Sequence, residues 1–263
     1  MKFVRQYLDL IFEKVTQKNW DNVIAIVGDE GVGKSNLALW VLEYWYKKLN
    51  GECKHEDIKH MCLTGAEFVE DLKDCTKYEC TVFDEAGEIS NRRAMAKFNV
   101  SIMKAYQIIR GDNLFTIMVL PDLFDLDPFF VRRRCKALFQ VYKRGRVRFW
   151  SKSRLRKLVA LNVDQRIKSY YKVKPTFYDT FSIYKGVLAA GYDEKKAAKM
   201  KEVRKKLYKE VMEQDSKSNE WQKKRDDLVV RLAERYGSRE AAEIVGVSKS
   251  RINQIRKQAT SEE

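Results

Sequence analysis

Two periods of hydrophobicity alternate along the first 160 residues of the chain. Short apolar runs rich in β-branched residues predict buried strands, whereas apolar residues at three- and four-residue spacing predict helices. Their alternation favours an α/β fold with a central, mainly parallel sheet flanked by helices. The predicted strands are Val23–Val27, Lys59–Leu63, Cys80–Phe83, Leu114–Leu120 and Ala137–Tyr142. The predicted helices include Asn36–Lys48, Ala66–Lys73 and Arg93–Arg110.

The pattern changes in the second half of the chain. From Ala190 to about Lys224 helix formers dominate, and neither glycine nor proline follows Gly191. A long charged helix or a pair of helices is expected there, with the sequence SKSN at 216–219 as the break. Three parts are therefore predicted, a first domain, a helical linker or extension and a final domain, at 1–160, 161–224 and 225–263.

A glycine-rich sequence, GDEGVGKS, occupies residues 28–35, directly after the first predicted strand. It matches the pattern Gly-x-x-x-x-Gly-Lys-Ser/Thr, whose backbone N–H groups bind phosphates at the start of a helix. In this P-loop pattern Lys34 reaches the β- and γ-phosphates, and the Ser35 hydroxyl ligates Mg²⁺. The alternative is a glycine-rich turn that binds nothing. The predicted phosphate-binding residues are Gly28, Asp29, Glu30, Gly31, Val32, Gly33, Lys34, Ser35 and Asn36.

A second candidate element begins where the predicted strand Cys80–Phe83 ends, with the acids Asp84 and Glu85. An acid at the end of a neighbouring strand can hold Mg²⁺ through a bound water, and the next acid can deprotonate an attacking water. Asp84 is therefore assigned to the metal and Glu85 to water activation. Apolar runs that end in Asp-Glu are common by chance, so the weight of this one comes from its combination with the glycine-rich loop.

These motifs resemble the RecA-like P-loop ATPases in which the catalytic glutamate directly follows the metal-binding aspartate. Within that group the chain is most similar to the DNA-translocase and zonula-occludens-toxin-like ATPases of viruses and plasmids. The sequences that carry the resemblance are GDEGVGKS at 28–35, VFDEAGE at 82–88 and LDPFFVRRR at 126–134. The resemblance implies ATP as the ligand, assembly into a ring, and a sheet whose phosphate-loop strand lies next to two later strands.

In such rings an arginine from a neighbouring subunit stabilises the charge that develops on the γ-phosphate. The triple arginine ahead of the last predicted strand supplies the candidates for this role, with Arg110 as a further one. The alternative is that the triple arginine is a basic surface turn. The residues expected to act in catalysis are Lys34, Glu85, Arg132, Arg133 and Arg134.

The strand that follows Asp-Glu departs from the family pattern at its tip. The pattern usually places a polar residue there, to sense the γ-phosphate, whereas this sequence has Leu120 and Pro121. Asp122 and Thr116 are the candidate substitutes. The departure favours a protein that binds ATP but hydrolyses it slowly.

Basic charge is concentrated in the second half of the chain. Residues 1–140 hold 20 basic and 21 acidic residues, whereas residues 141–263 hold 32 basic and 16 acidic residues. This asymmetry points to a polyanion bound by the second half. The alternative is a solvated basic surface that aids solubility.

A basic hairpin is predicted at Tyr142–Lys157, with its turn at Gly145. The segment holds eight basic residues and no acid, and the aromatic pair FW follows at 149–150 on the return strand. Cations interleaved with aromatic rings suit a phosphate backbone and stacked bases, so Arg144 and Arg146 are predicted DNA contacts. The alternative is a solvent-exposed hairpin that only closes the sheet.

Three short helices are predicted between Arg225 and Gln258. The first has an apolar face, and Gly237 is a natural stop for it. The second covers 239–245 and ends at Gly246, and Ser248 can cap the third. The residues expected inside this bundle are Leu228, Val229, Leu232, Ala242, Val247, Ile252 and Ile255.

This spacing resembles the DNA-binding helix-turn-helix domains of sigma-factor and resolvase type, over about residues 226–258. The resemblance implies that the last helix lies in the major groove of double-stranded DNA. The outward residues of that helix are of the types that contact base edges or phosphates. The alternative is a protein-binding three-helix bundle. The predicted DNA-binding residues are Lys249, Ser250, Arg251, Asn253 and Gln254 for bases, and Arg256 and Lys257 for phosphates.

Both histidines of the chain lie in the sequence CKHEDIKHMC at 53–62. The ligand types Cys53, His55, His60 and Cys62 invite a zinc interpretation, but zinc ligands are usually paired across a longer loop. A surface loop ahead of a strand is therefore the default. His60 and Cys62, on one face of that strand, are a candidate pair.

The sequence predicts a protein without membrane spans. Its strongly apolar runs, such as Leu114–Pro121, are too short to cross a bilayer. The first 15 residues indicate an amphipathic helix rather than a secretory signal. Five cysteines in a chain of 263 residues do not indicate a disulfide framework. A reducing, cytoplasmic location is therefore expected, which is the host cytoplasm if a virus encodes the protein.

Two functional hypotheses account for these features. The first is an ATPase that acts on double-stranded DNA in the translocation, packaging or replication of a mobile genetic element, as a homo-oligomeric ring or dimer. The second is an ATP-switched DNA-binding regulator with slow turnover. The adjacent acids Asp84 and Glu85 favour the first hypothesis, and the apolar strand tip favours the second.

Overall fold

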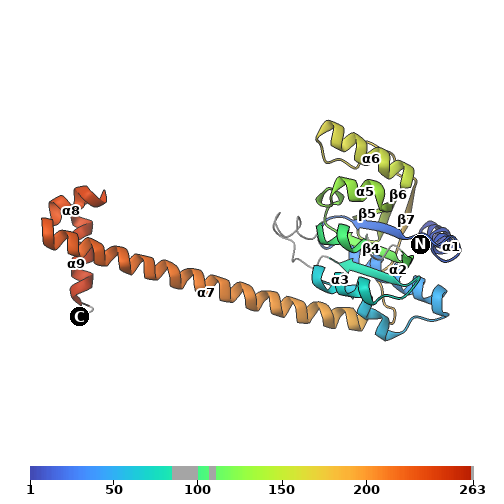
Figure 1. The fold of residues 1–263 in the computed structure, drawn as a ribbon, viewed down its shortest axis with the longest axis horizontal. Helices are drawn as coiled ribbons and strands as arrows, with labels where there is room; N and C mark the ends of the chain where they lie inside the picture. The colour runs from blue at the N-terminus through green and yellow to red at the C-terminus, as the bar shows by residue number, and fades with distance from the viewer. Residues whose placement is uncertain (85–99, 107–110, 262–263) are drawn as a thin grey trace. The chain divides into compact units, whose positions relative to one another are not determined.

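The computed structural model describes the backbone of residues 1–84, 100–106 and 111–261. The chain forms two compact units, Met1–Lys199 and Met200–Glu263. Within the described residues of the first unit, seven strands form a single sheet (Figure 1). The strands are β1 (Asn22–Val27), β2 (Met61–Cys62), β3 (Cys80–Asp84), β4 (Phe115–Leu120), β5 (Cys135–Lys143), β6 (Arg146–Ser151) and β7 (Phe177–Thr180).

The sheet is parallel through most of its width. Its strand order is β2-β3-β4-β1-β5-β6-β7, with parallel pairing from β2 to β5 and antiparallel pairing from β5 to β7. β1 therefore lies between two later strands, β4 and β5, as the sequence led us to expect. The predicted hairpin turn is also confirmed, because β5 and β6 pair across a turn that contains Gly145. The hairpin ends earlier than predicted, because its return strand stops at Ser151 and residues 152–157 begin a helix.

Helices cover both faces of the sheet (Figure 1). On one face, α1 (Lys2–Thr16) and α2 (Lys34–Asn50) pack against one set of alternate residues of β1. On the other face, α3 (Gly65–Asp74), α5 (Pro128–Arg133) and α6 (Lys152–Gln165) pack against the remaining set. Every residue of β1 is buried as a result, which explains why its sequence is a continuous apolar run.

The predicted strand Lys59–Leu63 is shorter than expected. Only Met61 and Cys62 are in β2, and the residues before them form the 3₁₀ helix η1 (His55–His60). A local hydrogen bond favours this turn, because the Asp57 carboxylate accepts from the Lys54 backbone N–H at 2.7 Å. His60 therefore ends a helix rather than beginning a strand. The predicted helix Arg93–Arg110 is helical at 100–106, and the rest of it lies outside the described residues.

The first unit continues well beyond residue 160. After α6, β7 adds to the sheet edge beside β6, and the segment that follows joins the core under α1 and α2. Phe181, Tyr184 and Leu188 of this segment are at most 9% exposed. Residues 161–199 are thus part of the α/β unit rather than a linker.

A single helix, α7 (Ala189–Tyr236), begins in the first unit and ends in the second. The predicted break at 216–219 is wrong, because the helix runs through this sequence without interruption. Serine and asparagine cost a helix only a few tenths of a kcal/mol each, far less than proline. The sequence SKSN is therefore too weak a signal to end a helix that holds neither glycine nor proline from 192 to 236.

The second unit consists of the end of α7, α8 (Ser238–Val245) and α9 (Lys249–Ser261). The two turns are as predicted, because Gly237 and Gly246 have φ of 83° and 71°, a conformation that glycine adopts without strain. The buried residues of the bundle are Val229, Ala233, Ala241, Ala242, Ile252 and Ile255.

Two residues expected in this bundle lie outside it. Leu228 is 58% exposed and Val247 is 38% exposed. Val229 and Ala233, one helical turn apart, form the inward face of α7, and Leu228 is rotated away from that face by about 100°. Val247 lies in the short turn between α8 and α9, where its side chain faces solvent.

Two further expectations concern membranes and disulfides. Across the described part of the chain, no helix combines the length and the apolar character needed to cross a bilayer. All five cysteines lie in this part, and each is a free thiol.

Candidate functional site

The glycine-rich loop joins β1 to α2 and has the strand before it and the helix after it that its motif requires. β5 passes so close that a Cβ on Gly28 would stand 2.3 Å from the carbonyl oxygen of Val141. Gly28, Gly31 and Gly33 have φ of 148°, 74° and 100°. Residues with a Cβ rarely adopt such angles, so the glycines of the motif are needed for the path of the backbone.

Lys34 folds over the loop. Its Nζ donates hydrogen bonds to the carbonyl oxygens of Gly28 and Asp29, at 2.7 and 2.8 Å. These bonds hold the ammonium group at the loop, where it would meet an anion bound by the loop N–H groups and the first turn of α2.

Ser35 and Asp84, the two predicted Mg²⁺ ligands, come together. Asp84 is the last residue of β3 and is only 4% exposed. The Tyr192 hydroxyl donates a hydrogen bond to its carboxylate at 2.7 Å, and the Ser35 hydroxyl lies close enough to lower the pKa of that carboxyl group. Strand β3 and the loop after β1 therefore bring a hydroxyl and a carboxylate oxygen to one place. Such hard oxygen ligands are those that Mg²⁺ prefers.

Burial dominates the electrostatics of Asp84. Desolvation raises the pKa of its carboxyl group above the ordinary value of 3.8, because the charged form loses its hydration. Hydrogen bonds from Tyr192 and Ser35, and then the charges of Lys196 and Lys34, partly offset this effect. The site thus holds a carboxylate that lacks full compensation within the protein and would gain from a cation.

Tyr192 is a component of the site that the sequence did not reveal. It lies in the first turn of α7 and is 6% exposed. Its hydroxyl reaches Asp84 across 108 positions of sequence. Lys195, three residues later, donates to the backbone oxygens of Ile58 and Met61 at 3.3 and 3.0 Å. The start of α7 is therefore attached both to Asp84 and to the end of η1.

The segment before α7 also packs against the loop. The side-chain oxygen of Asn36 accepts a hydrogen bond from the Tyr184 backbone N–H at 3.0 Å. A Cβ on Gly33 would contact the ring of Phe181 at 3.8 Å. Asn36, predicted to contact phosphate, thus anchors this segment to the first turn of α2 through its side-chain oxygen.

Arg144, one of the predicted DNA contacts, lies at the glycine-rich loop. It is exposed in the turn between β5 and β6, and its Nε donates to the carbonyl oxygen of Gly31 at 3.1 Å. The turn is anchored, because the Phe181 backbone N–H donates to the Gly145 oxygen at 2.9 Å. Arg146, the other predicted DNA contact of the hairpin, is exposed at the start of β6.

The aromatic pair of the hairpin cannot stack on nucleic-acid bases. Phe149 and Trp150 are 1% and 0% exposed, and the Trp150 indole donates to the Val173 carbonyl oxygen at 2.7 Å. Both residues are buried because each face of the sheet is covered at β6. The prediction of base stacking by these rings is therefore wrong.

The three candidate arginine fingers differ in their surroundings. Arg132 and Arg133 are exposed at the end of α5. Arg134 forms an ion pair with Asp21 at 2.9 Å and lies over the ring of Tyr106 at 5.7 Å. Arg134 therefore supports the fold where β5 begins, whereas Arg132 and Arg133 lie at the surface.

The carboxyl end of β4, the next strand after Asp84, presents no free polar side chain to a γ-phosphate among the two candidate residues. Thr116 is fully buried near the start of β4, so it is not the substitute for a polar tip residue. The Asp122 carboxylate accepts hydrogen bonds from the Phe124 backbone and from the Tyr170 hydroxyl, so it is committed to the turn after β4.

Several predicted residues are exposed, and some lie outside the described part of the chain. Asp29, Glu30 and Gly31 are exposed in the loop, and Val32 is half-buried. Glu85, predicted to activate water, and Arg110 lie outside the described residues.

In the second unit, the residues predicted to contact DNA are all exposed on α9, while Ile252 and Ile255 between them are buried. The exposed residues are Lys249, Ser250, Arg251, Asn253, Gln254, Arg256 and Lys257.

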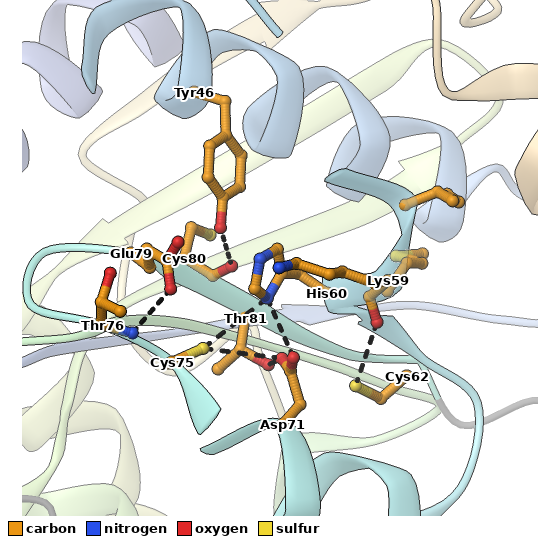
Figure 2. Close-up of polar contacts among 12 residues, drawn as sticks. Tyr46, Lys59, His60, Cys62, Asp71, Cys75, Thr76, Glu79, Cys80 and Thr81 are labelled. Atoms are coloured by element: carbon orange, nitrogen blue, oxygen red, sulfur yellow. Dashed lines mark hydrogen bonds and ion pairs between the residues drawn. The ribbon is translucent and has the colours of Figure 1, made fainter. Parts of the chain in front are cut away.

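The predicted cysteine and histidine set is not brought together. His60 instead lies against Asp71 and Cys75 (Figure 2), two residues that follow it in the sequence at the end of α3. These partners do not stand out in the sequence, because they lie 11 and 15 residues after His60 and outside the run of ligand types at 53–62. The spacing of Asp71 and Cys75, four residues apart on one helical face, is the signal that could have found them.

Comparison of the chain with protein-family models, with curated proteins and with solved structures finds no match.

The burial of Asp84 predicts a stabilising substitution. The pKa of Asp84 is higher in the folded state than its ordinary value of 3.8. The free energy of unfolding therefore falls as the pH rises from 3.8 through the folded-state pKa, by about 1.4 kcal/mol for each unit by which the pKa is raised. Asp84→Asn keeps the shape without the charge, so the variant should unfold at higher temperature than wild type at pH 7. The difference should shrink as the pH falls toward 4. Asp112→Asn, at an exposed carboxylate, is the matched control, and equal melting curves for all three proteins at pH 7 would contradict the prediction.

Proposed function

We propose that the protein binds ATP with Mg²⁺ at the loop 28–35 and uses its binding or hydrolysis to act on double-stranded DNA. One observation carries this proposal most strongly. The Ser35 hydroxyl and the buried Asp84 carboxylate, far apart in sequence, meet beside a glycine loop of the P-loop pattern. A glycine-rich turn without a ligand gives no reason to bury a carboxylate there.

The strand order supports the same assignment. β4 lies between β1, which leads into the loop, and β3, which ends in Asp84. All three strands are parallel, so the loop and Asp84 share the carboxyl edge of the sheet, where ligands of open α/β sheets bind. A RecA-like ATPase core is the specific fold that we propose for the first unit.

Each residue of the site then has a role. Lys34 and the loop N–H groups neutralise the β- and γ-phosphates, and Ser35 and Asp84 hold Mg²⁺. Glu85 activates the attacking water. Assembly into a homo-oligomeric ring or dimer would allow Arg132 or Arg133 to reach the γ-phosphate of a neighbouring subunit.

The second unit is the proposed DNA-binding element. Its helices α8 and α9 are joined by a short turn at Gly246 and share a buried cluster, which supports the helix-turn-helix that we propose. On α9, the buried pair Ile252 and Ile255 leaves a face of cations and amides exposed. These are the groups that contact bases and phosphates of a duplex.

A second candidate function is an ATP-switched DNA-binding regulator with slow turnover. The apolar tip of β4 favours it, because neither Thr116 nor Asp122 is placed to sense a γ-phosphate. The contact of Tyr192 with Asp84 also favours it, because Mg²⁺ would compete with this hydroxyl for the carboxylate.

Nucleotide binding is tested by calorimetry of the full chain with ATP, in Mg²⁺ and in excess chelator. We expect binding that requires Mg²⁺, that is lost in Lys34→Ala, and that loses its Mg²⁺ dependence in Asp84→Asn. Steady-state turnover with and without duplex DNA then separates the two functions. A DNA-stimulated rate abolished by Glu85→Gln identifies the ATPase, and negligible turnover with intact binding identifies the switch.

In the calorimetry, absence of Mg²⁺-dependent binding of any purine triphosphate would refute the proposal.

The contact of Arg144 with the loop predicts that this arginine binds nucleotide rather than DNA. A charge-assisted hydrogen bond contributes about 1.5–3 kcal/mol, so Arg144→Ala should weaken ATP binding by about tenfold or more. Arg146→Ala, two residues away with the same loss of charge, should change ATP affinity by less than about twofold. Equal effects of the two substitutions on ATP affinity, measured by calorimetry, would show that the Gly31 contact is irrelevant.

The exposed face of α9 predicts the salt dependence of DNA binding. The double variant Lys249→Ala/Lys257→Ala removes two cations, so the slope of log affinity against log salt should fall by about 2 for duplex DNA. The control, Lys206→Ala/Arg231→Ala, removes two exposed cations from α7. Fluorescence anisotropy over a salt series gives both slopes. If the control lowers the slope as much, α9 is not the DNA contact.

A further inference from the structure

Three side chains of metal-ligand type meet inside the first unit, away from the nucleotide site. His60 ends η1, Asp71 lies in the last turn of α3, and Cys75 follows that helix directly (Figure 2). His60 and Cys75 are 2% and 7% exposed, and the side chain of Asp71 is 12% exposed. A carboxylate, an imidazole and a thiol are thus enclosed together with little contact with water.

The distances within this cluster are close to those around a tetrahedral zinc ion. Zinc bonds of about 2.0–2.1 Å to nitrogen or oxygen and about 2.3 Å to sulfur place the ligand atoms roughly 3.3–3.6 Å apart. The Cys75 Sγ lies 3.6 Å from His60 Nδ1 and 3.7 Å from Asp71 Oδ2. His60 Nδ1 and Asp71 Oδ1 are 2.9 Å apart, so they need to separate by only a few tenths of an ångström.

We propose that His60, Asp71 and Cys75 bind a zinc ion that fastens η1 and β2 to α3. The three residues supply one nitrogen, one oxygen and one sulfur. A thiolate and an imidazole are soft or borderline ligands and select zinc over magnesium or calcium. The proposal does not depend on nucleotide binding.

The surroundings orient the ligands as a metal site requires. The His60 ring stacks on Tyr46, with centroids 5.4 Å apart and planes inclined by 17°, which fixes the direction of Nδ1. The Thr81 hydroxyl of β3 donates to Asp71 Oδ2, and this bond fixes the carboxylate. Such outer contacts orient ligands before the metal arrives.

Three ligands leave the fourth position of a tetrahedral zinc ion to a further donor. Cys62, buried two residues after His60, is the candidate. Its sulfur lies 4.0 Å from the Lys59 carbonyl oxygen and outside the cluster of three, so its side chain would have to rotate to reach the ion.

The geometry points to a structural rather than a catalytic ion. Thr81, which contacts Asp71, lies three residues before Asp84 on β3, a separation of about 10 Å along a strand. Zinc would therefore lie too far from the Ser35–Asp84 pair to contact the same phosphate. Its effect would be to hold β2, a strand of only two residues, at the edge of the sheet.

The alternative is a hydrogen-bonded cluster without metal. The Asp71 carboxylate accepts from Thr81 and lies within hydrogen-bonding distance of His60, which partly satisfies it. The two possibilities differ in stoichiometric zinc content and in the response to removal of the Cys75 sulfur, so they are separable by measurement.

The test measures zinc by plasma mass spectrometry in the full-length protein, purified without chelators or a metal-affinity tag. We expect close to one zinc per chain in wild type, and a loss of most of it in Cys75→Ser and His60→Asn. The matched controls are Cys53→Ser and His55→Asn, which remove the same residue types from the same stretch of sequence but lie outside the cluster. Both controls should retain zinc.

Cobalt substitution keeps the test decisive if a ligand variant fails to fold. Wild type titrated with Co²⁺ should show thiolate-to-metal charge-transfer absorption and the intense visible bands of tetrahedral cobalt. Zinc added afterwards should displace these bands and raise the melting temperature. Wild type without stoichiometric zinc and without these bands would overturn the proposal. So would zinc that remains in Cys75→Ser, or that is lost equally in Cys53→Ser.

Discussion

The burial of one carboxylate, that of Asp84, is the constraint around which the proposed nucleotide site is arranged. A charge that is only 4% exposed needs compensation, and the hydroxyls of Ser35 and Tyr192 provide part of it. Ser35 is available because the glycine loop turns sharply enough to begin α2 beside β3. Tyr192 is available because the chain, after β7, returns under α1 and α2 before α7 begins. The glycine loop and the start of α7, which are remote in sequence, are therefore both positioned by contacts with the buried carboxylate of Asp84.

The parts of the fold that follow from local periodicity could be predicted from the sequence, and the parts that follow from contacts between distant segments could not. Residues 23–27 form a strand because both faces of that strand are buried, and the alternation of strand and helix then implies a parallel sheet. Gly237 and Gly246 mark turns because their backbone angles require glycine. The sequence around Tyr192, in contrast, resembles that of any charged helix, and nothing in it indicates a contact with Asp84.

The wrong predictions share a physical origin. Phe149 and Trp150 are interleaved with cations, a pattern typical of nucleic-acid binding, but the helices on the two faces of the sheet bury them. The sequence SKSN has a weak breaking tendency that good helix formers on both sides override. His60 lies in sequence among the ligand types Cys53, His55 and Cys62, although its partners in space come from the end of the next helix. In each case composition was interpreted locally, whereas tertiary packing decided the outcome.

Arg144 and Arg146 are two residues apart in one hairpin, but their surroundings differ. Both are exposed arginines of one hairpin, and composition alone groups them as DNA contacts. The turn places Arg144 at the carbonyl oxygen of Gly31, while Arg146 begins the antiparallel strand β6. The turn is held by the bond between Phe181 and Gly145, so the segment that precedes α7 also positions the cation at the loop. Because this segment leads into the helix that carries Tyr192, the glycine loop, Arg144 and Asp84 all depend on residues beyond 160.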